Sequence, residues 1–260
     1  MRLTALIVLA CLFLLGHSAG PRAGAEDALR PGISVEQAAT RVAEMDRARL
    51  AALENYIATR HYAVHNKRFN KHAEMTVRMI YRIPGKKEFE VISESGSSWI
   101  RNHVLRKMIQ AELEAGDGAM RDQTRITADN YQFRPAGMVQ EAGRSFHVFE
   151  LTPRAANKYL FRGRVWLDAE DAAVARIDAS PAVLPSFWTR DVRFVHRYDK
   201  HGEFWLPTSN HSETQVRIFG TTTVHIDYFG YRVNLPPNEI PKLNERAQVV
   251  RDSNPGTPTP

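Results

Sequence analysis

The sequence predicts an α+β protein built on a meandering antiparallel sheet. Two helical segments lie in the first half of the chain, and almost only strands follow them. Apolar residues recur every three to four positions in the helical segments, whereas in the strands they alternate with polar residues. The strands follow one another at spacings of about eight to twelve residues, with turns between them, which is typical of an antiparallel meander.

The composition is that of an ordinary globular domain. Of the 260 residues, 43% are hydrophobic and 25% are charged, and the formal net charge is +6. These proportions exclude a collagen-like or wholly disordered chain. A single cysteine excludes an internal disulfide and a cysteine-rich zinc site. The one long apolar run is at the N-terminus, so a multi-spanning membrane protein is also excluded.

The N-terminus has the features of a secretory signal peptide. Met1-Arg2 is followed by an apolar run over residues 3–16 that is too short to span a bilayer, and Ala23-Gly24-Ala25 is a small-x-small cleavage motif. We therefore expect a signal peptide over residues 1–25 and a periplasmic or secreted mature chain. Cys11 lies in a sequence that loosely resembles a lipobox, but the apolar run continues past it, so we do not expect a lipid-anchored form. The mature chain would then contain no cysteine, which suits an oxidising compartment.

The mature chain is predicted to form one domain. A flexible lead over residues 26–33 precedes a domain over 34–233, and a Pro-rich tail over 234–260 is predicted to be disordered. The first segment of the domain, from Val35 to about Thr59, has the spacing of one amphipathic helix.

Two strands and a second helix are predicted next. Strand alternation covers residues 73–83 and 88–95, with a turn at Pro84-Gly85-Lys86. A second amphipathic helix is predicted over residues 99–114, and Gly116-Asp117-Gly118 should end it. The segment 124–133 is ambiguous. The strands predicted after it are 138–140, 146–151, 159–168, 173–179, 192–198, 204–206, 211–219 and 222–233.

This order of elements, with a signal peptide, resembles the LolA/RseB-type fold, and more closely a group of bacterial outer-membrane lipoprotein-sorting proteins. The resemblance covers about residues 40–233. The motifs that carry it are FNKHAEM (69–75), SESGS (93–97), DNYQF (129–133), YLFRG (159–163), PSFW (185–188) and FWLP (204–207). It implies a curved, incompletely closed antiparallel β-barrel of about ten strands, covered by two or three helices. It also implies binding of acyl chains in a concave apolar interior. LolA closes its lid with an arginine, and no motif here assigns that role to Arg78 or Arg82, which lie on the strand predicted at 73–83.

The apolar faces of the predicted strands are the candidate lining of a lipid cavity. Methionines suit such a lining because their flexible thioethers adapt to ligands of different shape. Two outcomes remain open at this point: a cavity that accepts acyl chains, or a core packed solid with these side chains. The candidate lining residues are Met75, Val77, Met79, Tyr81, Phe146, Val148, Val165, Leu167, Phe194, Val216, Ile218, Val224 and Ile226.

The helix at 99–114 is the candidate lid of this cavity. Its stripe of Ile100, Val104 and Met108 must be buried against another apolar face, and the open side of the sheet is the natural one. Glycines before and after it are candidate hinges, although a permanently docked helix is an equal alternative. Trp188 and Trp205, each beside a phenylalanine and near a proline, are candidate rim residues for a partner or a lipid interface, or else they seal a corner of the sheet.

The sequence does not indicate catalysis, a cofactor or a metal. It has no GxSxG, SxxK or HExxH motif, and His61 and His65 lie on a predicted strand, where a four-residue spacing separates them by about 13 Å. His225 and Asp227 are expected to form a solvated pair on the outer face of a strand. Nucleic acid is not expected as a partner of an exported protein, and the dispersed basic residues suit a solvated outer face.

The leading hypothesis is therefore non-catalytic binding of lipid or lipoprotein acyl chains, for lipoprotein sorting or carriage or for envelope sensing. The alternative is a protein-interaction module of an envelope-stress regulator with a packed core. An unrecognised hydrolase using Ser145 is a third hypothesis, for which we expect no activity.

Overall fold

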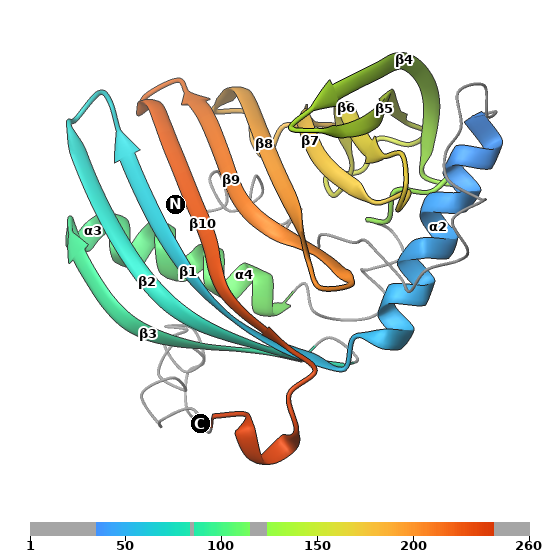
Figure 1. The fold of residues 1–260 in the computed structure, drawn as a ribbon. Helices are drawn as coiled ribbons and strands as arrows, with labels where there is room; N and C mark the ends of the chain where they lie inside the picture. The colour runs from blue at the N-terminus through green and yellow to red at the C-terminus, as the bar shows by residue number, and fades with distance from the viewer. Residues whose placement is uncertain (1–34, 84–85, 115–123, 242–260) are drawn as a thin grey trace, which may run out of the picture.

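The computed structural model describes residues 35–83, 86–114 and 124–241. Ten strands form one antiparallel sheet, in the order β3-β2-β1-β10-β9-β8-β7-β6-β5-β4 (Figure 1). The strands are β1 (Asn55–Asn66), β2 (Lys71–Arg82), β3 (Lys86–Gly96), β4 (Tyr131–Glu141), β5 (Arg144–Pro153), β6 (Phe161–Asp168), β7 (Val174–Pro181), β8 (Thr189–His201), β9 (Phe204–Val216) and β10 (Gly220–Val233). The end strands β3 and β4 do not pair with each other, so the sheet is open. This confirms the predicted fold class.

Helix α2 (Val35–Ala52) precedes the sheet, and a helical segment follows β3. That segment consists of α3 (Ser98–Ile100), a π-helical turn η2 (Arg101–Leu105) and α4 (Arg106–Glu114), and we call it the covering helix. It confirms the helix predicted at 99–114. The glycines predicted to end it lie outside the described residues. A short 3-10 helix, η3 (Pro237–Glu239), follows β10.

Both helices cover the same face of the sheet. Along one row of paired residues, Val64, Val224, Ser212 and Phe194 lie opposite one another on β1, β10, β9 and β8 and so point to one side. Val64 and Val224 belong to a hydrophobic cluster with the covering helix, and Phe194 belongs to a second cluster with α2. We call this side the inner face.

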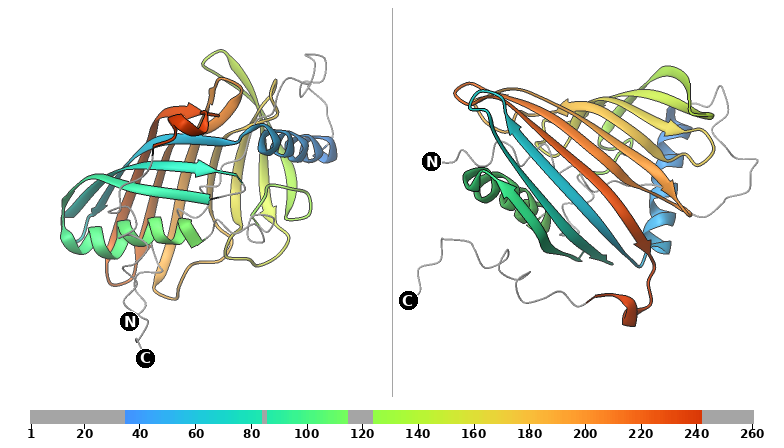
Figure 2. Two further views of the ribbon diagram at one scale, coloured as in Figure 1. Left: turned by 90° about the horizontal axis from the view of Figure 1, so that it is seen from below. Right: turned by 60° about the vertical axis from the view of Figure 1, so that its left-hand side comes forward.

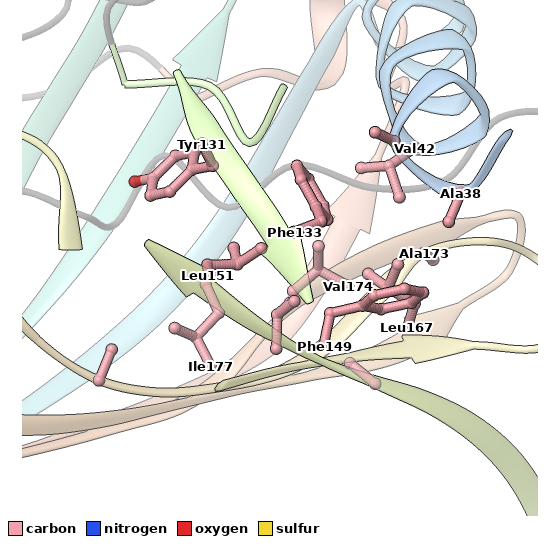
Figure 3. Packing of buried hydrophobic residues seen from close by; sticks show 14 of the residues in the cluster. Ala38, Val42, Tyr131, Phe133, Phe149, Leu151, Leu167, Ala173, Val174 and Ile177 are labelled. Carbon is pink, nitrogen blue, oxygen red and sulfur yellow. The ribbon is translucent and has the colours of Figure 1, made fainter. Parts of the chain in front are cut away.

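The second cluster fills the space between α2 and strands β4–β8. Figure 3 shows Ala38 and Val42 of α2 facing Phe133 and Ala173. Gly163 of β6 lies in the same row of the inner face, opposite Ala179 of β7. A Cβ atom on Gly163 would clash with the carbonyl oxygen of Asp178, so β6 and β7 approach too closely there for any side chain.

The first helix is shorter than predicted. The prediction extended it to Thr59, but α2 ends at Ala52 and β1 begins at Asn55. Tyr56 instead pairs with Tyr81 of β2, and their rings stack 5.1 Å apart. The side chain of Asn234 donates to the carbonyl of Ala52 and accepts from the amide of Glu54, at 2.8 Å each, and so terminates the helix. That partner is distant in sequence, which is why local periodicity did not indicate the end.

Two further boundaries differ from the prediction. Residues 204–206 and 211–219 were predicted as separate strands, but β9 runs unbroken from Phe204 to Val216. Arg197 and Tyr198 of β8 lie opposite Ser209 and Pro207, so Thr208 is an extra residue that makes β9 bulge and accommodates Pro207 within the strand. The tail was predicted to be disordered from residue 234, yet residues 234–241 are described, and Asn234 contacts α2. Residues 242–260 lie outside the described residues.

Candidate ligand-binding site beneath the covering helix

The covering helix buries one apolar face against the inner face of the sheet. Ile100, Val104 and Met108, which the sequence indicated, are at most 4% exposed, and Leu105 and Ile109 join them. They pack in one cluster with residues of the inner face on β2 and β3. Those residues include Met75, Val77, Met79, Tyr81 and Phe89. Figure 2 shows the helix lying along β2 and β3 from two directions.

The turn into this helix is built by Gly96 and Ser97. Gly96 has a positive φ of 77°, and a Cβ there would lie 2.5 Å from the carbonyl oxygen of His72. The Ser97 amide donates to the same carbonyl at 2.8 Å, and its hydroxyl accepts from the amide of Ile100 as an N-cap. This end of the helix is therefore fixed to β2.

A cluster of three charged side chains is buried between the covering helix and the sheet. Glu112 of α4 accepts from Arg60 of β1 and from Lys87 of β3, each at 2.6 Å. All three side chains are at most 5% exposed. The Arg60 guanidinium also lies over the rings of Phe89 and Tyr228, at 5.4 and 5.0 Å from their centroids. We call Arg60, Lys87 and Glu112 the charge cluster.

Glu112 and Arg60 of the charge cluster are ionised. Burial by itself would raise the pKa of Glu112, but Arg60 and Lys87 lower that pKa to about 2. Burial likewise opposes the charge on Arg60, while Glu112 raises the pKa of Arg60 well above its usual value. The covering helix is thus held to the sheet by buried opposite charges as well as by apolar contact.

A second set of ion pairs joins the start of the covering helix to the end of β3. Glu94 accepts from Arg101 and from Arg106, each at 2.7 Å. These side chains are 25–30% exposed, so solvent screens the pairs. They fix the orientation of the helix more than they stabilise it.

The sequence did not identify the charge cluster. Arg78 and Arg82, which it placed on a suitable strand, pair with Glu90 and Glu88 of the neighbouring strand, away from the covering helix. From the sequence, Arg60 was not expected to contact the covering helix or to point to the inner face, because the first helix was predicted to continue to Thr59. The alternation of Arg60 with Tyr62 and Val64 was the available signal.

The candidate lining residues do not form one continuous surface. Met75, Val77, Met79, Tyr81, Val224 and Ile226 lie in the cluster with the covering helix. Val165, Leu167, Phe194 and the partly buried Phe146 lie in the cluster with α2. Val148 and Val216 are buried but belong to neither cluster. Ile218 is 50% exposed in the turn after β9, so its assignment to the lining was wrong.

Strand β5 shows why this division was not predicted. Its apolar residues occupy both faces, and the sequence favoured Phe146 and Val148. In the structure Phe149 and Leu151 are buried in the second cluster, whereas Phe146 is only partly buried against it and Val148 belongs to neither cluster. Alternation alone cannot assign the inner face of a strand when neighbouring positions are both apolar.

A row of polar residues on β9 separates the two clusters. Asn210, Ser212 and Thr214 are each at most 2% exposed and lie opposite His196, Phe194 and Val192 of β8. Asn210 Nδ2 lies 2.5 Å from His196 Nε2. Burial lowers the pKa of His196 to about 3, so its imidazole is neutral near pH 7. The inner face is therefore apolar on both sides of a polar strip.

The two candidate rim tryptophans differ. Trp188 is 43% exposed in the loop before β8. Trp205 is 1% exposed in the second cluster, where its indole donates to Asp171 at 2.8 Å and Arg144 lies over its ring. The assignment of Trp205 to a rim was wrong, because this indole finds both apolar contact and a hydrogen-bond acceptor inside the fold.

No group of three or more histidine, cysteine, aspartate or glutamate side chains is placed to hold a metal within the described residues. His225 and Asp227 pair at 2.9 Å, and both side chains are nearly half exposed on β10. In the same part of the chain, no helix combines the length and hydropathy needed to cross a membrane.

The overall layout is similar to several solved bacterial structures. A DUF1329 family protein from Desulfovibrio piger matches over 77% of this chain and 93% of its own, at 12% identity and a TM-score of 0.40. A LolA superfamily protein from Nitrosomonas europaea matches over 80% and 97%, at 9% identity and 0.37. An outer membrane lipoprotein-sorting protein domain from Vibrio parahaemolyticus matches over 72% and 88%, at 12% identity and 0.35.

These similarities include the kind of protein that the sequence motifs indicated. No protein-family model matches the chain, and no curated protein matches it. The TM-scores lie below 0.5 and the identities do not exceed 12%, so these similarities concern the fold alone.

Proposed function

We propose that this protein binds acyl chains of a lipid or lipoprotein, without catalysis, between the covering helix and the inner face of the sheet. The observation that carries the proposal is the charge cluster buried within an otherwise apolar helix–sheet contact. The proposed setting is the periplasm or the exterior, after removal of residues 1–25. The proposed roles are lipoprotein sorting or carriage, or envelope sensing.

A contact that only had to stabilise the fold would not need these charges. Replacing a buried ion cluster by well-packed apolar residues is often neutral or stabilising by about 1–4 kcal/mol. When the covering helix separates from the sheet, its apolar stripe loses favourable burial, but the three charges regain water. Hydration of the charge cluster therefore offsets part of the cost of opening.

The surface uncovered by such a movement suits acyl chains. Met75 and Met79 on β2 and Met108 on the covering helix face the same cluster, and their unbranched side chains can repack around a chain of variable shape. The buried polar strip on β9 lies at the border of this surface. It offers hydroxyl and amide groups to the ester or amide end of an acylated ligand.

The proposal is tested by uptake of a fluorescent fatty acid by the purified exported protein. Met79→Glu places a carboxylate beneath the covering helix and is expected to weaken uptake at least tenfold, because its burial would cost several kcal/mol. Ile92→Glu is the matched control, because Ile92 is 52% exposed, and it should leave uptake unchanged.

Circular dichroism must show that Met79→Glu keeps its strand content. If Met79→Glu does not fold, Met79→Leu and Met108→Leu provide a second comparison. Both conserve side-chain volume, and both are expected to change which fatty-acid chain lengths the protein prefers. A folded Met79→Glu protein with undiminished uptake would contradict binding at this site.

A second function is favoured by the dense packing of the two clusters. If both remain closed, the molecule acts as a protein-interaction module of an envelope-stress regulator. That function predicts one stoichiometric protein partner from an envelope extract, no bound lipid, and no fatty-acid uptake.

A further inference from the structure

Exposed large apolar side chains gather at one end of the sheet, away from the charge cluster. They lie on three connections: the β1–β2 turn, the β7–β8 loop and the β9–β10 turn. Figure 2 shows the β1–β2 and β9–β10 hairpins side by side at this end. Phe187 is 74%, Phe69 51%, Ile218 50% and Trp188 43% exposed. We call these four residues the aromatic rim.

The aromatic rim is held in place by contacts between the connections. The backbone amide of Arg217 donates to the carbonyl of Trp188 at 2.9 Å, which joins the β9–β10 turn to the β7–β8 loop. Arg68 Nη1 donates to the carbonyl of Ile218 at 2.7 Å, which joins the β1–β2 turn to the β9–β10 turn. A Cβ on Gly220 would lie 2.8 Å from Cβ of Arg68, so these two turns are in close contact.

The rings themselves are also braced while they remain exposed. Phe187 lies edge-on to Trp188 with a centroid distance of 5.7 Å, and Phe69 lies edge-on to Phe219 at 6.0 Å. Large apolar side chains that are fixed in an exposed position are typical of an interaction surface.

Basic groups surround the aromatic rim. The guanidinium groups of Arg217 and Arg68 lie over the rings of Phe187 and Phe69, at 4.7 and 5.8 Å. Lys71 and Arg190 are exposed beside the same connections. The nearby carboxylates of Glu213 and Asp191 are paired with Lys67 and Arg193. The surface therefore combines exposed aromatic rings with a surplus of positive charge.

We infer that the aromatic rim docks the protein onto the surface of an anionic phospholipid membrane. Aromatic side chains favour the headgroup region, where apolar and polar surroundings meet. Lysine and arginine side chains beside them are attracted by anionic headgroups. This inference goes beyond the proposed acyl-chain binding and does not require the covering helix to open.

The test is co-sedimentation of the exported protein with vesicles of phosphatidylcholine containing one quarter phosphatidylglycerol. Binding is expected to be much weaker to phosphatidylcholine alone and to fall in high salt. Phe187→Ser/Trp188→Ser should weaken binding by about tenfold or more, because it removes exposed apolar area that enters the interface. The matched control, Ile92→Ser, removes an equally exposed apolar side chain from β3 and should bind like the wild type.

Charge is tested separately. Arg190→Gln/Arg217→Gln should weaken binding by more than tenfold, since each basic group near the surface contributes about a fivefold factor. Arg162→Gln/Arg164→Gln removes the same charge from β6 and should have little effect. Equal losses in both double variants would mean nonspecific attraction and would overturn the inference.

The position of Trp188 is tested by quenching with brominated phospholipid in the same vesicles. Quenching should be strong in the wild type, retained in Trp166→Phe and largely lost in Trp188→Phe. Vesicle binding without quenching of Trp188 would overturn the inference. Undiminished vesicle binding by Phe187→Ser/Trp188→Ser would also overturn the inference. The same holds if that variant binds vesicles normally but has lost binding to a protein partner. Fatty-acid uptake by the same variant should be normal, so failure of docking and failure of acyl-chain binding are distinguishable.

Discussion

His196 is a buried titratable side chain whose protonation the fold resists. Its pKa is about 3 in the folded protein, compared with an ordinary value of 6.5, because burial penalises the charged ring. Below pH 6.5 the unfolded chain therefore binds a proton that the folded chain does not bind. As the pH is lowered from 6.5 to about 4, the free energy of unfolding should therefore decrease by roughly 1 kcal/mol for each pH unit.

Urea denaturation at pH 7 and pH 5 measures this effect. His196→Gln keeps a polar partner for Asn210 but does not titrate, so its stability should depend less on pH over this interval. Glu112 does not interfere, because its stabilisation is present above its ordinary pKa of 4.5 and is lost only as the pH falls towards 2. Equal pH dependence of the two proteins would show that His196 is protonated or exposed in solution.

The covering helix is the element on which the proposed function depends. Replacing the charge cluster by Arg60→Met/Lys87→Met/Glu112→Leu should leave the fold intact or stabilise it by about 1–4 kcal/mol. The same change should slow fatty-acid uptake, because opening would no longer rehydrate buried charges. Thermal unfolding and the uptake rate, measured on one preparation, separate the two effects.

Glu112→Gln alone should destabilise the contact between the covering helix and the sheet. It leaves Arg60 and Lys87 buried without a counter-charge, so hydrogen exchange across residues 98–114 should accelerate. Glu94→Gln is the control, because Glu94 is partly exposed and its loss should change exchange only slightly. Faster uptake in the apolar triple variant would contradict the role assigned to the charge cluster.

The sequence predicted well those elements whose pattern is local. Alternation over residues 73–83 identified β2, and the apolar stripe over 99–114 identified the covering helix and its buried residues. The end of α2 was not predictable in this way, because Asn234 terminates the helix from the far end of the domain. The charge cluster was missed for the same reason, since Arg60 and Glu112 are 52 positions apart.

For the whole molecule, the open sheet with two helices on one face explains both proposed surfaces. The inner face holds two apolar clusters separated by polar residues of β9, and the helix over one cluster is attached through buried charges. The ends of six strands bring three connections together to form the aromatic rim. A ligand site and a docking surface therefore lie on different parts of one sheet.

The measurement that tests the central claim most directly is mass spectrometry of an organic-solvent extract of the purified exported protein. The account predicts a defined phospholipid or other acylated species at close to one molecule per protein. An empty extract, from protein that also fails to take up a fluorescent fatty acid, would contradict it and would mean that the covering helix closes a permanently filled core.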